Sequence, residues 1–293
     1  MFAGTYTALV TPFHKGRVDE GAYKKLIYDQ VRGGVDGIVP VGTTGESPSL
    51  GFDEHIWVIE LAVQAAKGRV KILAGTGANS TTEAIHLTRA AEAAGVDGSL
   101  QVAPYYNKPS QEGLFQHFKK IARATRLPII LYSIPGRCNI AIEVPTVQRL
   151  AKACKNIVGI KEAGGDADRV SRLRAALGQR FTILSGDDAL TLPFMAVGAE
   201  GVISVASNII PRQIAKMVNA FATGNSAAAL RLHQKYYPMF KDLFIETNPV
   251  PAKAALAMQG KCTEEYRLPL CKMSASNRAQ LAKTLKACGV LKK

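Results

Sequence analysis

The segment 33–42 reads GGVDGIVPVG, and near-copies of it recur as AGVDGSLQVA at 94–103 and as VGAEGVISVA at 197–206. In each copy a glycine ends a helical pattern, an acidic residue and a second glycine form a turn, and an apolar stretch follows. Short connections of this kind lead from a helix into a strand of an α/β fold. The repeat therefore predicts that helices and strands alternate along the chain.

Eight apolar stretches that each lead into small or polar residues extend this pattern. They lie at 5–12, 36–43, 70–77, 97–104, 128–135, 156–163, 181–188 and 201–208. Most are separated by segments of helical period, such as 19–34 and 81–95, which begin near Ser, Thr, Asp or Glu and stop at Gly. Eight parallel strands joined by right-handed helical crossovers close into a (β/α)8 TIM barrel, which is the fold we predict.

The alternative for an alternating chain of this length is a doubly wound open sheet. Such a sheet carries a G-x-G-x-x-G turn at a helix start, and GTGANS at 75–80 is the nearest match but lacks the third glycine. After residue 225 the strand patterns stop, and helical patterns occupy 227–244, 249–260 and 274–291. We therefore predict a barrel domain at 1–224 and an α-helical C-terminal domain at 225–293, packed on or beside the barrel.

The bulk composition is that of a soluble globular protein. Hydrophobic residues make up 47% of the 293 and charged residues 20%, with no run of about 18 apolar residues to span a membrane. The N-terminus enters its first strand pattern almost directly, without a signal or transit leader, so we expect a cytoplasmic protein without a membrane partner. The five cysteines are odd in number, widely spaced and never in C-x-x-C, which favours reduced thiols.

The formal net charge of +14 raises the question of nucleic-acid binding. Lys and Arg are scattered through the helical segments, so we expect a generally basic surface, which favours encounters with anionic metabolites, and no nucleic-acid partner. A non-catalytic basic barrel that binds RNA or an acidic partner is the alternative from another functional class. Salt-dependent retention on nucleic acid would be its signature.

Lys161 ends the sixth apolar stretch, where an unpaired buried charge would be costly. Because side chains alternate across a strand, Lys161 shares a face with Gly159 and Ile157, whereas Val158 and Ile160 suit packing under the helices. We therefore expect Lys161 to point into the barrel at its C-terminal mouth, where Gly159 leaves room and where barrel enzymes keep their active sites. The alternative is a lysine that reaches the surface from the strand end.

Two more polar side chains are expected at the same mouth. Tyr132 shares its parity with Ile130, and Thr43 ends the second stretch on the face of Val39 and Val41. Singly, a tyrosine there would be a core residue and a threonine a cap. Together with Lys161 they suit one chemistry. A desolvated amine attacks a ketone or aldehyde to give a Schiff base, and a phenol linked to a hydroxyl shuttles the protons.

This chemistry requires no metal and no cofactor beyond the covalent Schiff base on Lys161. The histidines show no ligand-like spacing, and none falls at the C-terminal end of a predicted strand. They are His14, His55, His86, His117 and His233. We therefore predict no metal site.

The motifs GTTGE (42–46), YSIPGR (132–137) and GIKEA (159–163), in that order and spacing, resemble the class I pyruvate aldolases related to dihydrodipicolinate synthase and N-acetylneuraminate lyase. The stretches AGTGANST (74–81) and APYYNKPSQEGLFQHF (103–118) look closer to the dihydrodipicolinate synthase branch. The resemblance runs over essentially the whole chain, including the helical C-terminus.

The resemblance implies roles for four catalytic residues. Lys161 would form the Schiff base with pyruvate, and Tyr132 would be the general acid and base. Thr43 would pass protons between Tyr132 and Tyr106, with Tyr106 reaching in from a neighbouring subunit. A homo-oligomer is therefore implied, and a tetramer built as a dimer of dimers is usual in the family.

The resemblance also implies how substrates bind. Thr44 would hold the pyruvate carboxylate, Gly186 and Ile203 would supply backbone contacts, and Arg137 would grip the carboxylate of aspartate semialdehyde. Arg137 and Thr43 favour a synthase, since sugar-acid lyases typically carry an apolar residue and a serine at these positions. The implied reaction condenses pyruvate with L-aspartate 4-semialdehyde to 4-hydroxy-tetrahydrodipicolinate, the first committed step of diaminopimelate and lysine biosynthesis. The alternative is a Schiff-base aldolase or dehydratase of 2-keto-3-deoxy sugar acids or N-acetylneuraminate.

The chain also departs from the family pattern. Ser133 and Cys138 stand where Asn and Thr are common, and we expect altered loop packing from them rather than altered chemistry. The family's lysine-feedback cleft at the dimer interface is partly preserved in Ser47, His55, Asn79, Glu83 and Tyr105. Because Pro48 and Phe52 replace the small and imidazole residues of strongly lysine-sensitive bacterial enzymes, we predict lysine inhibition with weakened or altered affinity.

Overall fold

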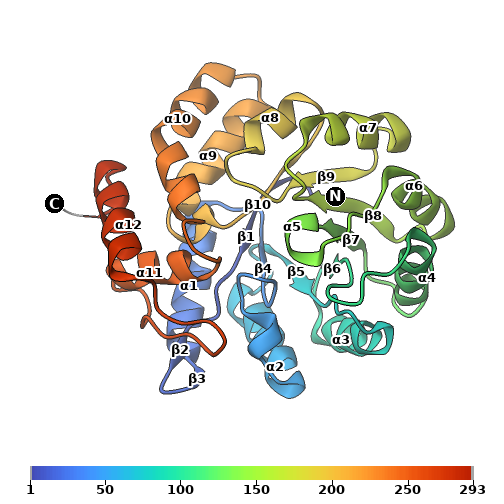
Figure 1. Ribbon diagram of the computed structural model, residues 1–293, viewed down its shortest axis with the longest axis horizontal. Coiled ribbons are helices and arrows are strands. Elements are labelled where there is room, and N and C mark those ends of the chain that lie inside the picture. Colours follow the sequence, from blue (N-terminus) through green and yellow to red (C-terminus); the bar gives the residue numbers. More distant parts are fainter. Residues whose placement is uncertain (1, 292–293) are drawn as a thin grey trace.

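The computed structural model describes residues 2–291, and its centre is a closed barrel of eight parallel strands ringed by helices (Figure 1). Around the barrel the strands are β1 (Gly4–Ala8), β4 (Gly37–Val39), β5 (Lys71–Gly75), β6 (Gly98–Val102), β7 (Ile129–Ser133), β8 (Ile157–Glu162), β9 (Thr182–Ser185) and β10 (Gly201–Ser204). Almost every strand falls within a predicted apolar stretch, although each is shorter than its stretch. The predicted (β/α)8 TIM barrel is confirmed.

The helices that follow the strands form the outer layer. They are α1 (Glu20–Gly33), α2 (Phe52–Ala66), α3 (Thr81–Ala94), α4 (Gln111–Ala122), α6 (Val144–Ala153), α7 (Ala167–Leu177), α8 (Thr191–Ala196) and α9 (Pro211–Ala222). Short turns of helix, η1 (Ser47–Ser49), α5 (Pro135–Cys138) and η2 (Ala206–Asn208), lie in loops that follow strands. A small hairpin of β2 (Phe13–His14) and β3 (Arg17–Val18) was not predicted.

The repeated helix-to-strand connection has the same structural role in its first two copies, at 33–42 and 94–103. Gly34 and Gly95 end α1 and α3 with φ of 75° and 84°, a conformation that favours glycine. The aspartate two residues later then bonds to the start of a neighbouring strand. Asp36 accepts the N–H of Thr5 at 2.8 Å, and Asp97 accepts an N–H of β5 at 2.7 Å. These carboxylates therefore link neighbouring segments at the barrel end opposite the mouth.

Two apolar layers stabilise the barrel. The outer one lies between strands and helices, and the inner one fills the barrel. The inner residues are Phe2, Tyr6, Ala8, Val39, Leu73, Leu100, Ile130, Tyr132, Leu184 and Ile203. Each large side chain buried in this way contributes about 1.5–3 kcal/mol relative to an exposed one. Because the interior is filled, a ligand can reach the barrel axis only at its mouth.

Strand β8 contains an irregularity that simple alternation does not predict. Ile129 pairs with Ile157, but the next residue of β7 pairs with Gly159, so Val158 is an extra residue of the kind found in a β-bulge. Ile157 consequently packs in the outer layer and Val158 against the inner one, the reverse of the prediction. Beyond the bulge Lys161 pairs with inward-facing Tyr132, so its predicted direction is confirmed.

The predicted C-terminal helices are α10 (Ser226–Asp242), α11 (Val250–Met258) and α12 (Ala275–Ala287), seen beside α1 and α9 in orange and red (Figure 1). Helix α10 packs on α9, and α11 packs on η2 and α12. The division at 224/225 stays a prediction, and residue 1 and residues 292–293 lie outside the described part. Within residues 2–291, no helix is long and apolar enough to cross a membrane.

Candidate active site

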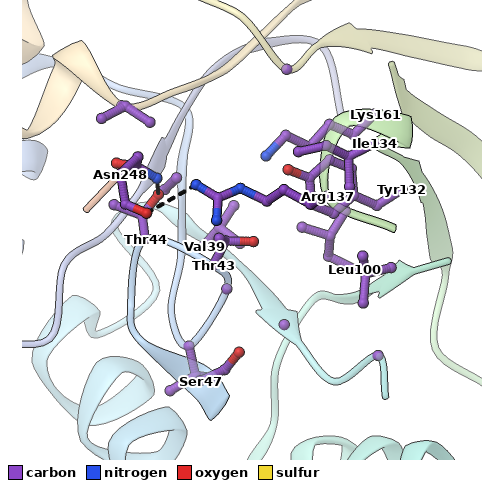
Figure 2. A pocket seen from close by; sticks show the side chains of 18 of the residues that line it. Val39, Thr43, Thr44, Ser47, Leu100, Tyr132, Ile134, Arg137, Lys161 and Asn248 are labelled. Carbon is purple, nitrogen blue, oxygen red and sulfur yellow. Dashed lines mark hydrogen bonds between the residues drawn. The ribbon is translucent and has the colours of Figure 1, made fainter. Parts of the chain in front are cut away.

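A cavity of about 280 Å³ opens at the carboxyl ends of the barrel strands (Figure 2). Six of the polar side chains that line it come from four separate regions of the chain. They are Thr43, Thr44, Tyr132, Arg137, Lys161 and Asn248. The fold therefore brings together most of the residues that the sequence placed at the mouth.

Lys161 is the buried amine of this cavity. Its side chain reaches from β8, the residue is 6% exposed, and Nζ lies 4.0 Å from the centroid of the Tyr132 ring. Burial lowers the pKa of Lys161 to about 7, while the charge of Asp188 raises that pKa and the charge of Arg137 lowers it. A large fraction of the amine is therefore neutral, and nucleophilic, near neutral pH.

Glu162, the next residue in the chain, does not pair with the Lys161 amine. It faces away from the cavity, as predicted, and its Oε2 pairs with Arg169 Nε at 2.8 Å. Its Oε1 accepts the N–H of Gly164 at 2.7 Å. Glu162 is therefore occupied in joining β8 to α7.

The room beside Lys161 comes from a different glycine than predicted. A Cβ at Gly159 would lie 2.6 Å from the Thr182 carbonyl oxygen and 2.7 Å from Ile130, so Gly159 permits close strand packing. A Cβ at Gly186 would instead lie 2.7 Å from Ala163 Cβ and 3.0 Å from Lys161 Cε. Gly186 follows β9, whereas Lys161 belongs to β8, so alternation along β8 alone did not reveal this difference.

Tyr132 and Thr43 meet at the cavity as predicted, but Thr43 does not stand on a strand. The Thr43 hydroxyl acts to lower the pKa of the Tyr132 phenol, but burial has the larger effect and raises that pKa above its usual value, so the phenol keeps its proton. Strand β4 ends at Val39, and Thr43 lies in the turn that follows. The chain leaves the strand because Val41 takes a left-handed φ of 48°, and Gly45 packs against its backbone.

Thr44 and Asn248 lie on the other side of the cavity, and Arg137 reaches across to them from the side of Tyr132 and Ile134 (Figure 2). The Asn248 Nδ2 donates to Thr44 Oγ1 at 2.9 Å, and Arg137 Nη2 donates to the Asn248 carbonyl oxygen at 3.0 Å. Asn248 precedes α11 in the C-terminal region, and the sequence analysis missed it. An asparagine between two helical patterns carries no signal of its own, because only the fold brings it to the mouth.

Asp188 is a second residue that the sequence analysis missed. It is buried, its Oδ1 accepts the hydroxyl of Ser204, and its Oδ2 accepts the N–H groups of Val205 and Ala206 at 3.0 and 2.9 Å. Burial raises the pKa of Asp188 to about 6, although these hydrogen bonds oppose the change. Its charge acts on Lys161, and its place in SGDD, directly after β9, was the available signal.

The comparison with known proteins agrees with this geometry. The model described as the Dihydrodipicolinate synthetase family matches residues 1–288. The chain belongs to this family. It is 52% identical over 292 residues to the 4-hydroxy-tetrahydrodipicolinate synthase of Endomicrobium trichonymphae, covering 100% of both chains.

Solved structures of the family are also very similar. The 4-hydroxy-tetrahydrodipicolinate synthase of Methylacidiphilum fumariolicum SolV superimposes with a TM-score of 0.98 at 56% identity, covering 99% of this chain and 96% of that one. The lysine-bound dihydrodipicolinate synthase of Cyanidioschyzon merolae gives a TM-score of 0.96 at 43% identity and 99% coverage of each chain. The resemblance stated from the motifs is therefore confirmed.

Two residues that the family resemblance placed at the site do not line the cavity of this chain. Ile203 is part of the inner apolar layer, with Tyr132 and Leu184. Tyr106 is 91% exposed and has a left-handed φ of 73°. Its side chain is therefore presented to the surroundings rather than to the cavity of its own chain.

A second cavity, of about 290 Å³, lies next to the first. Four of the five residues of the predicted lysine cleft line it, namely Ser47, His55, Glu83 and Tyr105, together with Pro48 and Phe52. The fifth, Asn79, supports this cavity by donating to the Tyr105 carbonyl oxygen at 3.3 Å. The His55 ring bonds the Gly75 carbonyl oxygen at 2.9 Å, and burial lowers the pKa of His55.

The remaining predictions concern the cysteines, the two positions that depart from the family pattern, and metal binding. All five cysteines are free. Ser133 accepts the N–H of Ile142 at 3.3 Å, and Cys138 contacts the Ala103 carbonyl oxygen at 3.1 Å while bordering the cavity. Among residues 2–291, no group of three or more His, Cys, Asp or Glu side chains is arranged to hold a metal ion. The absence of a metal from the reaction stays a prediction.

Proposed function

We propose that this chain is a cytoplasmic lyase that condenses pyruvate with L-aspartate 4-semialdehyde to give 4-hydroxy-tetrahydrodipicolinate. The observation that carries the proposal is the Lys161 amine, buried, of pKa about 7 and 4.0 Å from the Tyr132 ring, in a chain of this family. The alternative substrates, 2-keto-3-deoxy sugar acids and N-acetylneuraminate, are not favoured by the named relatives.

The reaction begins with attack of neutral Lys161 on the ketone carbon of pyruvate. A carbinolamine forms, and loss of water gives the iminium, with protons moved by the Tyr132 phenol and the neighbouring Thr43 hydroxyl. Thr44 holds the pyruvate carboxylate. Gly186 leaves the space beside Lys161 in which the adduct is accommodated.

The second stage forms the carbon–carbon bond. The pyruvate methyl group loses a proton, giving an enamine whose carbon attacks the aldehyde of the second substrate. Arg137, at the cavity edge, binds that substrate's carboxylate through its guanidinium. The amino group of the second substrate then adds to the iminium carbon, which closes the ring and releases the Lys161 amine. Over the cycle one water molecule is lost.

The proposal is tested by trapping the Schiff base. Incubation with pyruvate, reduction with borohydride and intact-protein mass spectrometry should show one reduced pyruvate per chain. The adduct should be absent from Lys161→Ala and present in Lys155→Ala, the control, since Lys155 is an exposed lysine near the same strand. An adduct that survives Lys161→Ala would refute the assignment. Faster cleavage of 2-keto-3-deoxy sugar acids than condensation with aspartate semialdehyde would refute the substrate.

We propose that Tyr106 completes the proton relay of a neighbouring subunit, which requires at least a dimer and fits a tetramer of two such dimers. Its 91% exposure on its own chain supports this. Tyr106→Phe and Lys161→Ala should each be nearly inactive alone. Mixed and reassembled, the two variants should regain activity, because one site then combines an intact Lys161 with an intact Tyr106. Full activity of Tyr106→Phe would contradict the proposal.

We propose that the second cavity binds lysine as a feedback inhibitor. Its Glu83 carboxylate and Tyr105 phenol offer partners for ammonium and carboxylate groups, and a relative was solved with lysine bound. Calorimetry should detect lysine binding to the parent and a large loss of affinity in Glu83→Gln. Glu92→Gln, on the same helix but outside this cavity, is the control. Equal lysine affinity in Glu83→Gln and the parent would contradict the site.

A further inference from the structure

Glu46, the last residue of the GTTGE motif, has no role in the proposed reaction, although only Gly45 separates it from Thr44 in the chain. It is 2% exposed and adopts a left-handed φ of 56°, which is uncommon for a residue other than glycine. Its N–H bonds the Thr43 carbonyl oxygen at 3.1 Å, closing the turn. The shape of this turn therefore depends on how Glu46 is held.

The partner that holds Glu46 comes from the C-terminal helices. Lys253 of α11 is 0% exposed, and its Nζ donates to Glu46 Oε1 at 2.5 Å. The ammonium lies 4.2 Å from the Phe13 ring centroid and 5.2 Å from that of Tyr266. Glu46 Oε2 accepts the N–H of Arg267 at 3.3 Å. Fully buried charges of this kind persist only when paired.

The same helix carries a second link to the site. Asn248, two residues before α11, bonds both Thr44 Oγ1 and the Arg137 guanidinium. The segment that leads into α11 thus contacts the proposed carboxylate-binding groups, and Lys253 in the first turn of α11 contacts the end of the Thr43–Thr44 turn. The ion pair joins residues 207 positions apart, so it can transmit the position of α11 directly to the turn.

We propose that Lys253 is a positioning residue for the proposed reaction: through its ion pair with Glu46 it holds the turn that presents Thr43 and Thr44 to pyruvate. The inference rests on the proposed function. It separates two tasks at the cavity. Lys161 is placed by strand β8, whereas the pyruvate-binding turn is placed by a helix outside the barrel.

The test compares Lys253→Met with the double variant Glu46→Gln/Lys253→Met. The single variant leaves a buried carboxylate without its partner, and its Tm should fall by about 10 °C. The double variant leaves no unpaired charge and should recover most of that loss. In both, the pyruvate concentration that half-saturates borohydride trapping should rise about ten- to hundredfold, because the turn is no longer held in place. The maximal adduct should remain one per chain, because Lys161 still stands on β8.

Lys261→Met is the matched control. Lys261 also ties the C-terminal region to the barrel, by a 3.0 Å ion pair with Asp29 of α1, but it does not touch the turn. This variant should keep the parental half-saturating concentration. An equal rise in Lys261→Met would show general loosening of the C-terminal helices and overturn the inference.

The outcomes for the inference and for the proposed function are separable. The inference alone would be refuted if the parent is active and the double variant has the same half-saturating pyruvate concentration and the same KM values as the parent. The Glu46–Lys253 pair would then only stabilise the fold. A parent that forms no pyruvate adduct would refute the proposed function and, with it, the inference.

Discussion

Strands β7 and β8 and the turn at 42–46 serve the same cavity but are held in place by different forces. Tyr132 and Lys161 are paired directly across the β7–β8 ladder, inside the packed barrel. Thr43 and Thr44 lie outside any strand, between Val41 and Glu46, whose left-handed conformations cost about 1–3 kcal/mol each. The difference indicates that the proposed reacting groups are placed by the barrel, and the proposed pyruvate-binding turn by contacts with distant segments.

The largest effect should come from the strand side of this comparison, in Tyr132→Phe. The ring and its contact with Lys161 remain, but the phenolic proton is lost, so kcat for condensation should fall about 10²–10⁴-fold. Steady-state kinetics measure this loss, and an unchanged Tm verifies the fold. A variant with parental kcat would remove Tyr132 from the proton relay.

Substitution of Gly186 and substitution of Gly159 should have different main effects. The Cβ of Gly186→Ala would lie 2.7 Å from Ala163 Cβ and 3.0 Å from Lys161 Cε, so we expect about a hundredfold slower pyruvate trapping together with a loss of unfolding free energy. The Cβ of Gly159→Ala would meet the Thr182 carbonyl oxygen at 2.6 Å, so that variant should mainly lose about 1–3 kcal/mol of unfolding free energy. Trapping kinetics and denaturant titration of both variants decide whether Gly186 alone serves Lys161.

A smaller effect is expected on the turn side, in Thr43→Val. This change removes the hydroxyl that acts on the Tyr132 phenol and preserves the side-chain shape. Because water can partly replace a hydroxyl at an open mouth, we expect about a tenfold fall in kcat. Thr44→Val is the comparison, and there KM for pyruvate should rise more than kcat falls. If Thr43→Val lost as much activity as Tyr132→Phe, the turn and the strands would contribute equally to proton transfer.

The smallest effect should be a shift in pH dependence. In the parent, trapping at subsaturating pyruvate should accelerate as pH rises through about 7, where Lys161 loses its proton, and level off above it. Asp188 raises the Lys161 pKa, so Asp188→Asn should move this midpoint to lower pH. Asp168→Asn, an exposed residue of α7, is the control. A midpoint that stays fixed or moves upward in Asp188→Asn would show that Asp188 does not tune the amine.

Much of the reaction centre was predictable from local pattern. Apolar stretches ending in polar residues located all eight barrel strands, and parity turned Lys161 and Tyr132 inward because both stand on regular strand beyond the bulge. The same rule failed at Ile157 and Val158, where the register changes, and at Thr43, where the strand ends early. The alternation of side chains between the two faces of a strand predicts their direction only where the strand pairs regularly with its neighbours.

The amino-acid sequence by itself determined the barrel, its family and the position of Lys161 at the barrel mouth, because these depend on periodicity and on short motifs. The tertiary structure alone decided the partners that complete the site: Asn248 on Thr44, Lys253 on Glu46, and Asp188 near Lys161. The first two pairs are separated by more than 200 residues. Such contacts follow from closure of the barrel and docking of the C-terminal helices, and no local pattern in the chain encodes them.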